Sequence, residues 1–270
     1  MKDSRIAAQG LVLLGCGKMG SAMLQGWLDR GLPATSIWVR DPAPSDWLQD
    51  QGVHLNTNLP GSPAILLVAV KPQMMADALP AIVAAAQDST IVLSVAAGTP
   101  ISKLEDHFGA SQPIIRAMPN TPAAIGRGIT AIVGNAAGQA GLDEAELLLS
   151  AVGQVVRLES EDQIDAVTGV SGSGPAYVFH LIETLAAAGE AQGVPTDLAM
   201  SLAKATVAGA GALAEAAEET PDKLRVNVTS PNGTTQAALE VLMNEDTGFP
   251  PLLRKAVAAA TARSKELANG

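Results

Sequence analysis

The stretch LVLLGCGKMG, residues 11–20, can be interpreted in two ways. As a bacterial lipoprotein signal it would present Cys16 for lipid attachment, whereas as a buried strand followed by a glycine turn it would bind a phosphate group. A secretory segment needs a sustained apolar core, and Gln9 and Gly10 interrupt this one. The glycine pattern also continues past the cysteine. We therefore expect a strand that leads into a phosphate-binding turn.

Composition indicates a globular protein with a substantial core. The chain has 270 residues, 47% of them hydrophobic, which is enough for one large domain or two smaller ones. Its 27 acidic and 17 basic residues give a net charge of −10, which argues against a nucleic-acid partner. A single cysteine rules out an internal disulfide, and three scattered histidines do not form a His/Cys metal site. We expect a cytoplasmic protein without a structural metal.

One later segment has the apolar character of a membrane span. Residues 198–214 read LAMSLAKATVAGAGALA and are rich in small side chains. The segment falls short of the roughly 20 residues that cross a bilayer, and Lys204 lies inside it. A close-packed helix in a core or at an oligomer interface is the better interpretation, so no membrane association is expected.

The first part of the chain alternates short apolar runs with longer segments of helical spacing. Continuous apolar runs are typical of strands that are buried on both faces, and helices between such strands are typical of parallel connections. The pattern predicts a mostly parallel sheet with helices on both faces. Strands are predicted at 11–14, 36–39, 64–70, 90–96, 114–117, 129–133 and 155–158, and helices at 19–30, 74–86 and 143–152.

The second part has a different character, since alanine-rich segments replace the β-branched runs after about Ser160. The acidic stretch 159–162 marks the predicted boundary, which gives two domains, residues 1–161 and residues 162–270. The fold class expected is an α/β N-terminal domain followed by an all-α C-terminal domain. Helices of the second domain are predicted at 163–193, 196–219, 234–244 and 251–268.

Gly15, Gly17 and Gly20 form the pattern G-x-G-x-x-G between the first predicted strand and its helix. The first glycine permits a tight turn, the second lets backbone N–H groups approach a pyrophosphate, and the third lets the helix pack against the strand. An ordinary glycine-rich loop is the alternative, but the surrounding strand, helix and parallel sheet favour a Rossmann-type dinucleotide site. The expected cofactor contacts here are Gly15, Gly17, Lys18, Met19 and Gly20.

The end of the second predicted strand bears on the choice of nucleotide. It reads IWVRDP and lies about 20 residues beyond the glycine turn. Asp41 can bind the ribose hydroxyls of NAD, whereas Arg40 can pair with the 2′-phosphate of NADP. Either side chain can equally be a solvated charge of the loop. Both residues are therefore expected cofactor contacts, and both nucleotides remain open.

Further polar groups follow the other predicted strands, where ligands of open α/β sheets bind. The sequences are AVKPQ at 69–73, SVAAG at 94–98 and AMPNTP at 117–122. Lys71 and Asn120 each lie next to prolines that stiffen the backbone. Plain turn chemistry explains the prolines but requires neither a lysine nor an asparagine.

Two glycine-rich insertions interrupt the helical part, GVSGSGPAY at 169–177 and VTSPNGTTQ at 228–236. In the first, Pro175 suits the first turn of a helix, so a helix break is expected just before it. In the second, a turn precedes a helix that begins at Thr234 and Thr235, and its free N–H groups and hydroxyls suit a carboxylate. The alternative is that Ser230 or Thr234 merely caps the helix.

These loops lack certain residues, and their absence limits the reactions that the site can catalyse. Reduction of a carbonyl creates an alkoxide, which needs a proton donor such as His, Lys or Tyr. The loops contain no histidine, and Tyr177 has Leu181 where a lysine that tunes it would stand. A protonated imine needs no strong acid, because the arriving hydride neutralises a charge that is already present. The pattern favours reduction of a C=N bond.

Six motifs, in this order and nearly this spacing, resemble the pyrroline-5-carboxylate reductases along essentially the whole chain. They are GCGKMGSAM, AVKPQ, SVAAG, RAMPNTP, GVSGSGPAYVF and NVTSPNGTTQAAL. The resemblance implies hydride transfer from NAD(P)H to the C=N bond of 1-pyrroline-5-carboxylate, which gives L-proline in the last step of proline biosynthesis. Family habit favours NADPH over NADH, although Asp41 and Pro42 stand where relatives place Asn-Arg or Ser-rich sequences.

The resemblance also implies site residues and an assembly. It adds Asn58, Val70, Lys71, Pro72, Ala96 and Asn120 to the expected cofactor contacts. It implies that the substrate lies in a loop contributed across a homodimer of interlocked helical domains, and in many relatives such dimers form larger rings. Ser230, Gly233, Thr234 and Thr235 are the expected substrate contacts, and Thr235 and Ser230 are the catalytic candidates, with Thr235 nearest the ring nitrogen.

Two other functions share parts of this pattern. A two-domain 3-hydroxyacid dehydrogenase would have a catalytic lysine four residues after the last glycine of the SGSG motif, where this chain has Val178. A non-catalytic NADP-sensing regulator would have no use for a second site shaped for a carboxylate. Both alternatives predict that pyrroline-5-carboxylate is not reduced.

Overall fold

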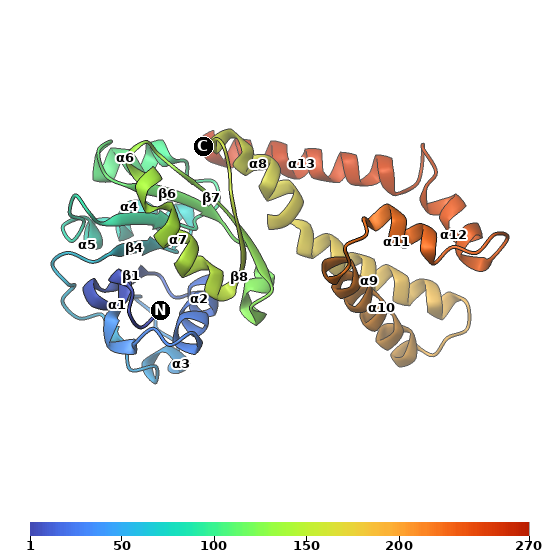
Figure 1. Ribbon diagram of the computed structural model, residues 1–270, viewed down its shortest axis with the longest axis horizontal. Helices are drawn as coiled ribbons and strands as arrows, with labels where there is room; N and C mark the ends of the chain where they lie inside the picture. The colour runs from blue at the N-terminus through green and yellow to red at the C-terminus, as the bar shows by residue number, and fades with distance from the viewer. Residues whose placement is uncertain (270) are drawn as a thin grey trace. The chain divides into compact units, whose positions relative to one another are not determined.

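The computed structural model describes residues 1–269, and the chain forms two compact units. The first unit comprises Met1–Gly172 and the segment that begins at Ala260, and the second comprises Ser173–Ala259. The last helix, α13 (Phe249–Asn269), leads the chain from the second unit back to the first (Figure 1).

The first unit is built on one eight-stranded sheet in the order β3-β2-β1-β4-β5-β6-β7-β8. Neighbours from β3 to β6 pair in parallel, β7 pairs antiparallel with β6, and β8 pairs in parallel with β7. The predicted mostly parallel sheet is confirmed. The strands are β1 (Leu11–Leu14), β2 (Ile37–Arg40), β3 (His54–Leu55), β4 (Ile65–Val68), β5 (Ile91–Ser94), β6 (Ile114–Met118), β7 (Gly128–Gly134) and β8 (Gly153–Arg157).

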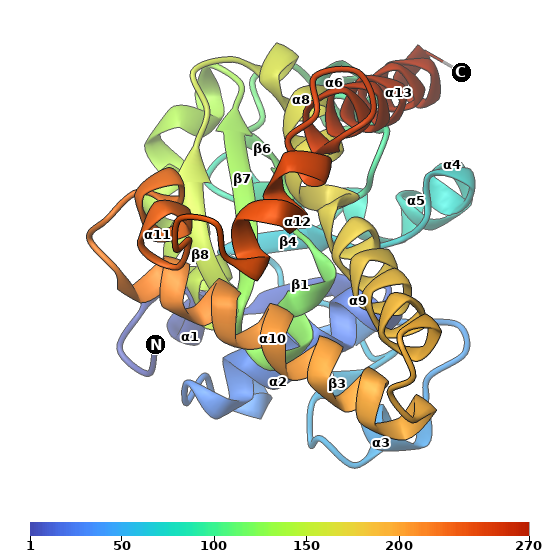
Figure 2. The ribbon, with the colours of Figure 1, turned by 90° about the vertical axis from the view of Figure 1, so that its right-hand side faces the viewer.

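Helices cover both faces of this sheet (Figures 1 and 2). Leu11 and Leu13 of β1 join a core with α2 and α7, whereas Val12 and Leu14 join a core with α4, α5 and α6. This two-sided burial explains why the strands are continuous apolar runs. The helices of this unit are α1 (Arg5–Gln9), α2 (Lys18–Asp29), α3 (Asp46–Gln49), α4 (Met75–Ala78), α5 (Pro80–Val83), α6 (Ile101–Phe108), α7 (Leu142–Leu149) and α8 (Ile164–Val167).

The single helix predicted at 74–86 is divided in the structure. It forms α4 and α5, which are separated at Leu79, and Pro80 stands in the first turn of α5. Proline lacks an N–H group and its ring clashes with the preceding turn, so it begins a helix more readily than it continues one. The two-residue strand β3 was not predicted, because so short a pairing leaves no periodic signal.

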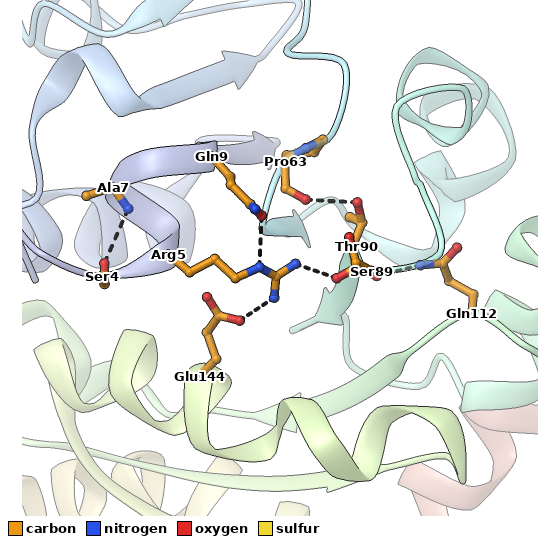
Figure 3. Close-up of polar contacts among 9 residues, drawn as sticks. All are labelled: Ser4, Arg5, Ala7, Gln9, Pro63, Ser89, Thr90, Gln112 and Glu144. Atoms are coloured by element: carbon orange, nitrogen blue, oxygen red, sulfur yellow. Dashed lines mark hydrogen bonds and ion pairs between the residues drawn. The ribbon is translucent and has the colours of Figure 1, made fainter.

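Arg5 fastens the first helix to the rest of the unit (Figure 3). Its guanidinium donates to Glu144 Oε2 of α7 at 2.6 Å and to Gln9 Oε1 at 2.8 Å. It also donates to the carbonyl oxygen of Ser89, just before β5. One partly buried side chain thereby joins α1, α7 and the start of a central strand.

The described part of the second unit contains helices and no strand, as predicted. Its helices are α9 (Gly174–Ala191), α10 (Thr196–Ala216), α11 (Pro221–Asn227), α12 (Thr234–Leu242) and the first part of α13. A π-helical turn at Thr168–Gly172 precedes α9, and Pro175 stands in the first turn of α9, close to the predicted break. Only Ala186, Ala199 and Ala203 form a buried cluster in this unit. No helix within residues 1–269 is both long and apolar enough to cross a membrane.

Candidate active site

Parallel pairing brings the predicted cofactor residues to one edge of the sheet. The carboxyl ends of β1, β2, β4, β5 and β6 lie along this edge, because these strands pair in parallel. In the strand order, β2 and β4 flank β1, so the chain switches direction across the sheet at the glycine turn. Open α/β sheets bind their ligands at such a switch point. The predicted cofactor residues at these strand ends are Arg40, the last residue of β2, and, after the strands, Gly15–Gly20, Asp41, Val70–Pro72, Ala96 and Asn120.

The three glycines of the turn have the three roles that the pattern predicts. Gly15 has a φ of +86°, and a Cβ there would lie 2.8 Å from Val70 Cγ1. A Cβ on Gly20 would lie 2.5 Å from the carbonyl oxygen of Gly15, so α2 packs directly on the turn. A Cβ on Gly17 would meet nothing within 4 Å. The open space over Gly17 is where a phosphate group can approach the backbone.

The start of α2 suits a negatively charged group. Gly17 is the N-cap residue, no side chain caps the helix, and its first turn contains no acidic residue. Gly17 and Lys18 are exposed, while Met19 is half-buried. The first N–H groups of a helix have no partner within it and carry partial positive charge, so this end favours a phosphate. The turn therefore fits the pyrophosphate of a dinucleotide.

Asp41 is fixed against the glycine turn at the end of β2. Its Oδ2 accepts the N–H of Cys16 at 2.7 Å, and its Oδ1 accepts the N–H of Ala43 at 2.8 Å. Asn56 clamps its backbone, since the Asn56 side chain accepts the N–H of Asp41 at 3.1 Å and donates to its carbonyl oxygen at 2.8 Å. The carboxylate is thus held over the second residue of the turn.

Asn56 is a residue that the sequence alone did not single out. It has a φ of +53°, a conformation that asparagine tolerates better than most residues, and it follows β3. Asn58, the predicted adenosine contact, is an exposed residue of the same loop. A cofactor contact at Asn58 stays a prediction.

Arg40 presents the opposite charge on the other side of the strand. Successive residues of a strand point to opposite faces, so Arg40 shares the face of Trp38, and Asp41 faces the glycine turn. The Arg40 Nε atom is buried and has no hydrogen-bond partner within the described residues. The two charges that conflict in the sequence therefore lie on different sides of the strand end.

Cys16 is a buried member of the turn. Burial, and secondarily the charge of Asp41, raise the pKa of its thiol from the ordinary 9.0 to about 12. The thiolate is the reactive form of cysteine, so this residue is inert at neutral pH. Its side chain belongs to the buried core that also contains Leu13 and Met23.

The loops after β4 and β5 present different surfaces. Lys71 and Pro72 are exposed, Val70 is half-buried against Gly15, and Lys71 precedes a short 3-10 helix at Pro72–Met74. Ala96 is buried in the loop between β5 and α6. Among these residues Lys71 is the cation available to solvent.

Asn120 is buried and its amide is engaged by the protein. Its Oδ1 accepts the N–H of Ile129 at 2.9 Å, and its Nδ2 donates to the carbonyl oxygen of Ser171 at 3.2 Å. Asn120 thereby joins the end of β6 to the start of β7 and to the GVSGSG segment. Its predicted contact with the cofactor stays a prediction.

The predicted substrate residues form a compact turn in the second unit. The N–H of Gly233 donates to the carbonyl oxygen of Ser230 at 3.0 Å, and Asn232 between them has a φ of +56°. Gln236 accepts the N–H of Asn232 at 2.7 Å. Gly233 is the N-cap residue of α12, and no side chain caps the helix. The alternative that Ser230 or Thr234 serves as the cap is therefore wrong.

This turn has the groups that bind a carboxylate. The first turn of α12 contains no acidic residue, and it begins with Thr234 and Thr235. Ser230 and Thr234 are exposed, and Thr235 is half-buried. Uncapped N–H groups and adjacent hydroxyls are the donors that a carboxylate requires.

A phosphate-binding glycine turn at the switch point of a mostly parallel sheet, in a chain with a second helical unit, defines a dinucleotide-dependent oxidoreductase. Residues 161–267 match the family model for pyrroline-5-carboxylate reductase dimerisation, and residues 10–98 match that of the NADP oxidoreductases described as coenzyme F420-dependent. The chain is 38% identical over 266 residues to the pyrroline-5-carboxylate reductase of Pseudomonas aeruginosa, covering 96% of this chain and 97% of that protein. The chain belongs to the pyrroline-5-carboxylate reductase family.

Other relatives agree with this assignment. The chain is 45% identical over 204 residues to the pyrroline-5-carboxylate reductase of a Synechocystis species, covering 75% of this chain and 74% of that protein. The pyrroline-5-carboxylate reductase of Coxiella burnetii has a similar structure, with a TM-score of 0.89, 32% identity, and coverage of 96% of this chain and 98% of that one. The Plasmodium falciparum pyrroline carboxylate reductase, determined with NADP bound, has a TM-score of 0.81 at 26% identity and covers 96% and 98%. The predicted fold class, family and use of NAD(P)H are confirmed.

Proposed function

We propose that this chain reduces the C=N bond of 1-pyrroline-5-carboxylate to give L-proline. The observation that carries the proposal is the match along 96% of the chain to a pyrroline-5-carboxylate reductase. Two features of the structure support it: the glycine turn suits the pyrophosphate of the cofactor, and the uncapped turn at 230–235 suits the carboxylate of the substrate. Bound NAD(P)H supplies the hydride for this reaction.

The first unit holds the cofactor in this proposal. Gly15, Gly17 and the N–H groups of Lys18 and Met19 bind the pyrophosphate, with Gly20 keeping α2 close to the turn. The remaining contacts are Arg40, Asp41, Asn58, Val70, Lys71, Pro72, Ala96 and Asn120. By role, we assign nucleotide binding to residues 1–161 and substrate binding and dimerisation to residues 162–270. This division differs from that of the two compact units, in which residues 162–172 and the segment from Ala260 belong to the first unit.

The turn at 230–235 holds the substrate. Ser230, Gly233 and Thr234 donate to the carboxylate, while Thr235 hydrogen-bonds near the ring nitrogen. A protonated imine already carries the proton of the product amine, so a hydroxyl that orients the ring is sufficient and no strong acid is needed. Thr235 and Ser230 are accordingly the residues to which we assign catalysis.

The family is built around a dimerisation domain, and the chain is a homo-oligomer. We assign it a homodimer that forms through the second unit and completes the substrate site. The support is that these helices expose many large apolar side chains, whereas the buried cluster of the unit consists of three alanines. The exposed large apolar residues of α9, α10, α12 and the first part of α13 are Val178, Phe179, Leu181, Leu185, Leu198, Leu202, Leu213, Val241, Leu242, Phe249, Leu252 and Leu253.

We place the enzyme in the cytoplasm, where its lone cysteine stays reduced.

An enzyme assay with the purified protein tests the proposed reaction. Pyrroline-5-carboxylate together with NADH or NADPH should cause loss of the reduced-cofactor absorbance and formation of L-proline. A parallel assay with 3-hydroxyacids and the oxidised cofactors tests the dehydrogenase alternative. Binding of the nucleotide without turnover of either substrate class would favour a regulator and refute the proposal.

A further inference from the structure

A buried arginine lies in the core strand β6, where an apolar side chain would be expected. The Arg116 side chain is 6% exposed and lies between Ile114 and Met118, two residues on the sheet face that α6 covers. Burying a guanidinium is costly unless a partner compensates its charge. The partner is Glu161, whose Oε1 accepts from Arg116 Nη1 at 2.6 Å.

The same glutamate oxygen makes a second contact. Glu161 Oε1 accepts the backbone N–H of Ile101, the first residue of α6, at 2.9 Å. The N-cap residue of α6 is Pro100, which has no side-chain group to bond that N–H. Glu161 therefore caps α6 from a distant part of the chain. Its own backbone is fixed by a capping box between Ser160 and Gln163.

This cap lies at one end of the loop that contains Ala96. The loop leaves β5 after Ser94 and enters α6 at Ile101. Within it, Gly98 has a φ of +69°, and a Cβ there would lie 3.1 Å from Leu267 Cβ of α13. Figure 2 shows α6, α8 and the C-terminal part of α13 side by side. The loop is thus held by Glu161 where it enters the helix, and it approaches Leu267 closely at Gly98.

We infer that Glu161, held by Arg116, is a positioning residue for the nicotinamide half of the cofactor. The inference rests on the proposed function, in which Ala96 contacts the nucleotide. In the strand order β5 lies on the other side of β1 from β2, whose end binds the adenosine half, so the loop after β5 faces the nicotinamide half. Without the glutamate, the first turn of α6 loses its cap and the short loop between Ala96 and Ile101 loses its fixed end. The glycine turn and the end of β2, which bind the adenosine and phosphate half, make none of these contacts.

Two nucleotides separate a positioning role from a general loss of stability. Dissociation constants are measured by calorimetry for the preferred reduced cofactor and for its fragment without the nicotinamide ring, ADP-ribose or 2′-phospho-ADP-ribose. The variants are Glu161→Ala, which removes the cap, and Glu161→Gln, whose amide oxygen can still accept the N–H of Ile101. Glu144→Gln is the matched control, because it weakens the partly buried ion pair with Arg5 in the same unit.

Glu161→Ala should weaken binding of the reduced cofactor about tenfold and lower kcat, while the fragment binds as in the wild type. Glu161→Gln should change the ratio of the dissociation constants of cofactor and fragment in the same direction, but less than Glu161→Ala does. Glu144→Gln should leave this ratio unchanged. If the alanine variant does not fold, the glutamine variant decides. Equal weakening of both ligands, or an unchanged ratio in the variants that fold, would overturn the inference. Wild-type protein that does not reduce pyrroline-5-carboxylate would instead refute the proposed function.

Discussion

Thr235 is the residue whose side chain we place nearest the reacting nitrogen. Replacing it with alanine should lower kcat/KM for pyrroline-5-carboxylate by about tenfold or more, because a lost substrate hydrogen bond is worth about 1.5 kcal/mol. Steady-state kinetics at saturating cofactor give this value. Thr235→Ser keeps the hydroxyl and should retain most of the activity. Wild-type kinetics in the alanine variant would remove Thr235 from the site.

A second prediction concerns the charge of Asp41 and the preference between NAD⁺ and NADP⁺. Its carboxylate is fixed over the glycine turn by the N–H groups of Cys16 and Ala43, so its charge opposes a 2′-phosphate bound at the strand end. Asp41→Asn keeps an oxygen for the Cys16 N–H and removes the charge. Affinity for NADP⁺ relative to NAD⁺ should rise about tenfold, as measured by calorimetry. An unchanged ratio would show that Asp41 does not set the preference.

From the raised pKa of the Cys16 thiol we expect the wild type and a Cys16→Ala variant to differ in how their stability changes at high pH. Its pKa is raised from 9.0 to about 12, so the folded protein holds this proton more tightly than the unfolded chain does. The resulting stabilisation is complete below about pH 9 and is lost as the pH rises toward 12. Urea unfolding at about pH 8 and about pH 10 should show the wild type losing more stability than Cys16→Ala, by up to about 1.4 kcal/mol per pH unit above 9. Parallel losses in the two proteins would contradict the raised pKa.

The sequence predicts the roles of some single residues and not of others. The roles of Gly15 and Gly20 follow from backbone geometry that any such turn requires, so the motif predicts them directly. Asn56 clamps Asp41 across the gap between two strands, and Glu161 caps a helix that begins 60 residues before it. Neither contact leaves a local pattern, because the fold alone brings these residues together.

At the level of the βα unit, two glycine substitutions should have separate effects. Gly20→Ala places a Cβ 2.5 Å from the Gly15 carbonyl oxygen, so α2 must move away from the turn, at a cost of roughly 1–3 kcal/mol of unfolding free energy. Gly17→Ala places its Cβ in open space and should leave stability nearly unchanged, while weakening nucleotide binding. Urea unfolding and cofactor titration of both variants test this. The contrary result is a Gly17→Ala protein that binds the cofactor as the wild type does.

The elements themselves were predictable to different degrees. The seven long strands were predicted to within a few residues, because burial on both sheet faces leaves continuous apolar runs. The antiparallel direction of β7 was not predicted, since an apolar run does not encode the direction of its pairing. Pro80 divides the helix expected at 74–86, and Pro221 begins α11, a helix that the sequence did not predict.

For the whole molecule, the apolar helices of the second unit should determine the oligomeric state. Leu202 of α10 is 52% exposed in the single chain, and Leu202→Glu should shift the protein from a dimer or larger assembly toward monomers. Light scattering coupled to size-exclusion chromatography measures this mass. Leu147→Glu is the control, since Leu147 of α7 is also an exposed leucine but belongs to the first unit. An unchanged mass in Leu202→Glu would contradict a role for Leu202 in assembly.

The central claim concerns one bond, formed between a hydride of the reduced cofactor and the imine carbon of pyrroline-5-carboxylate. The most direct measurement uses NADH or NADPH that carries deuterium in the transferred position, with mass spectrometry and NMR of the product. We expect L-proline with one deuterium on the ring carbon that was double-bonded to nitrogen. Absence of proline, or proline without deuterium at that carbon, would contradict the claim.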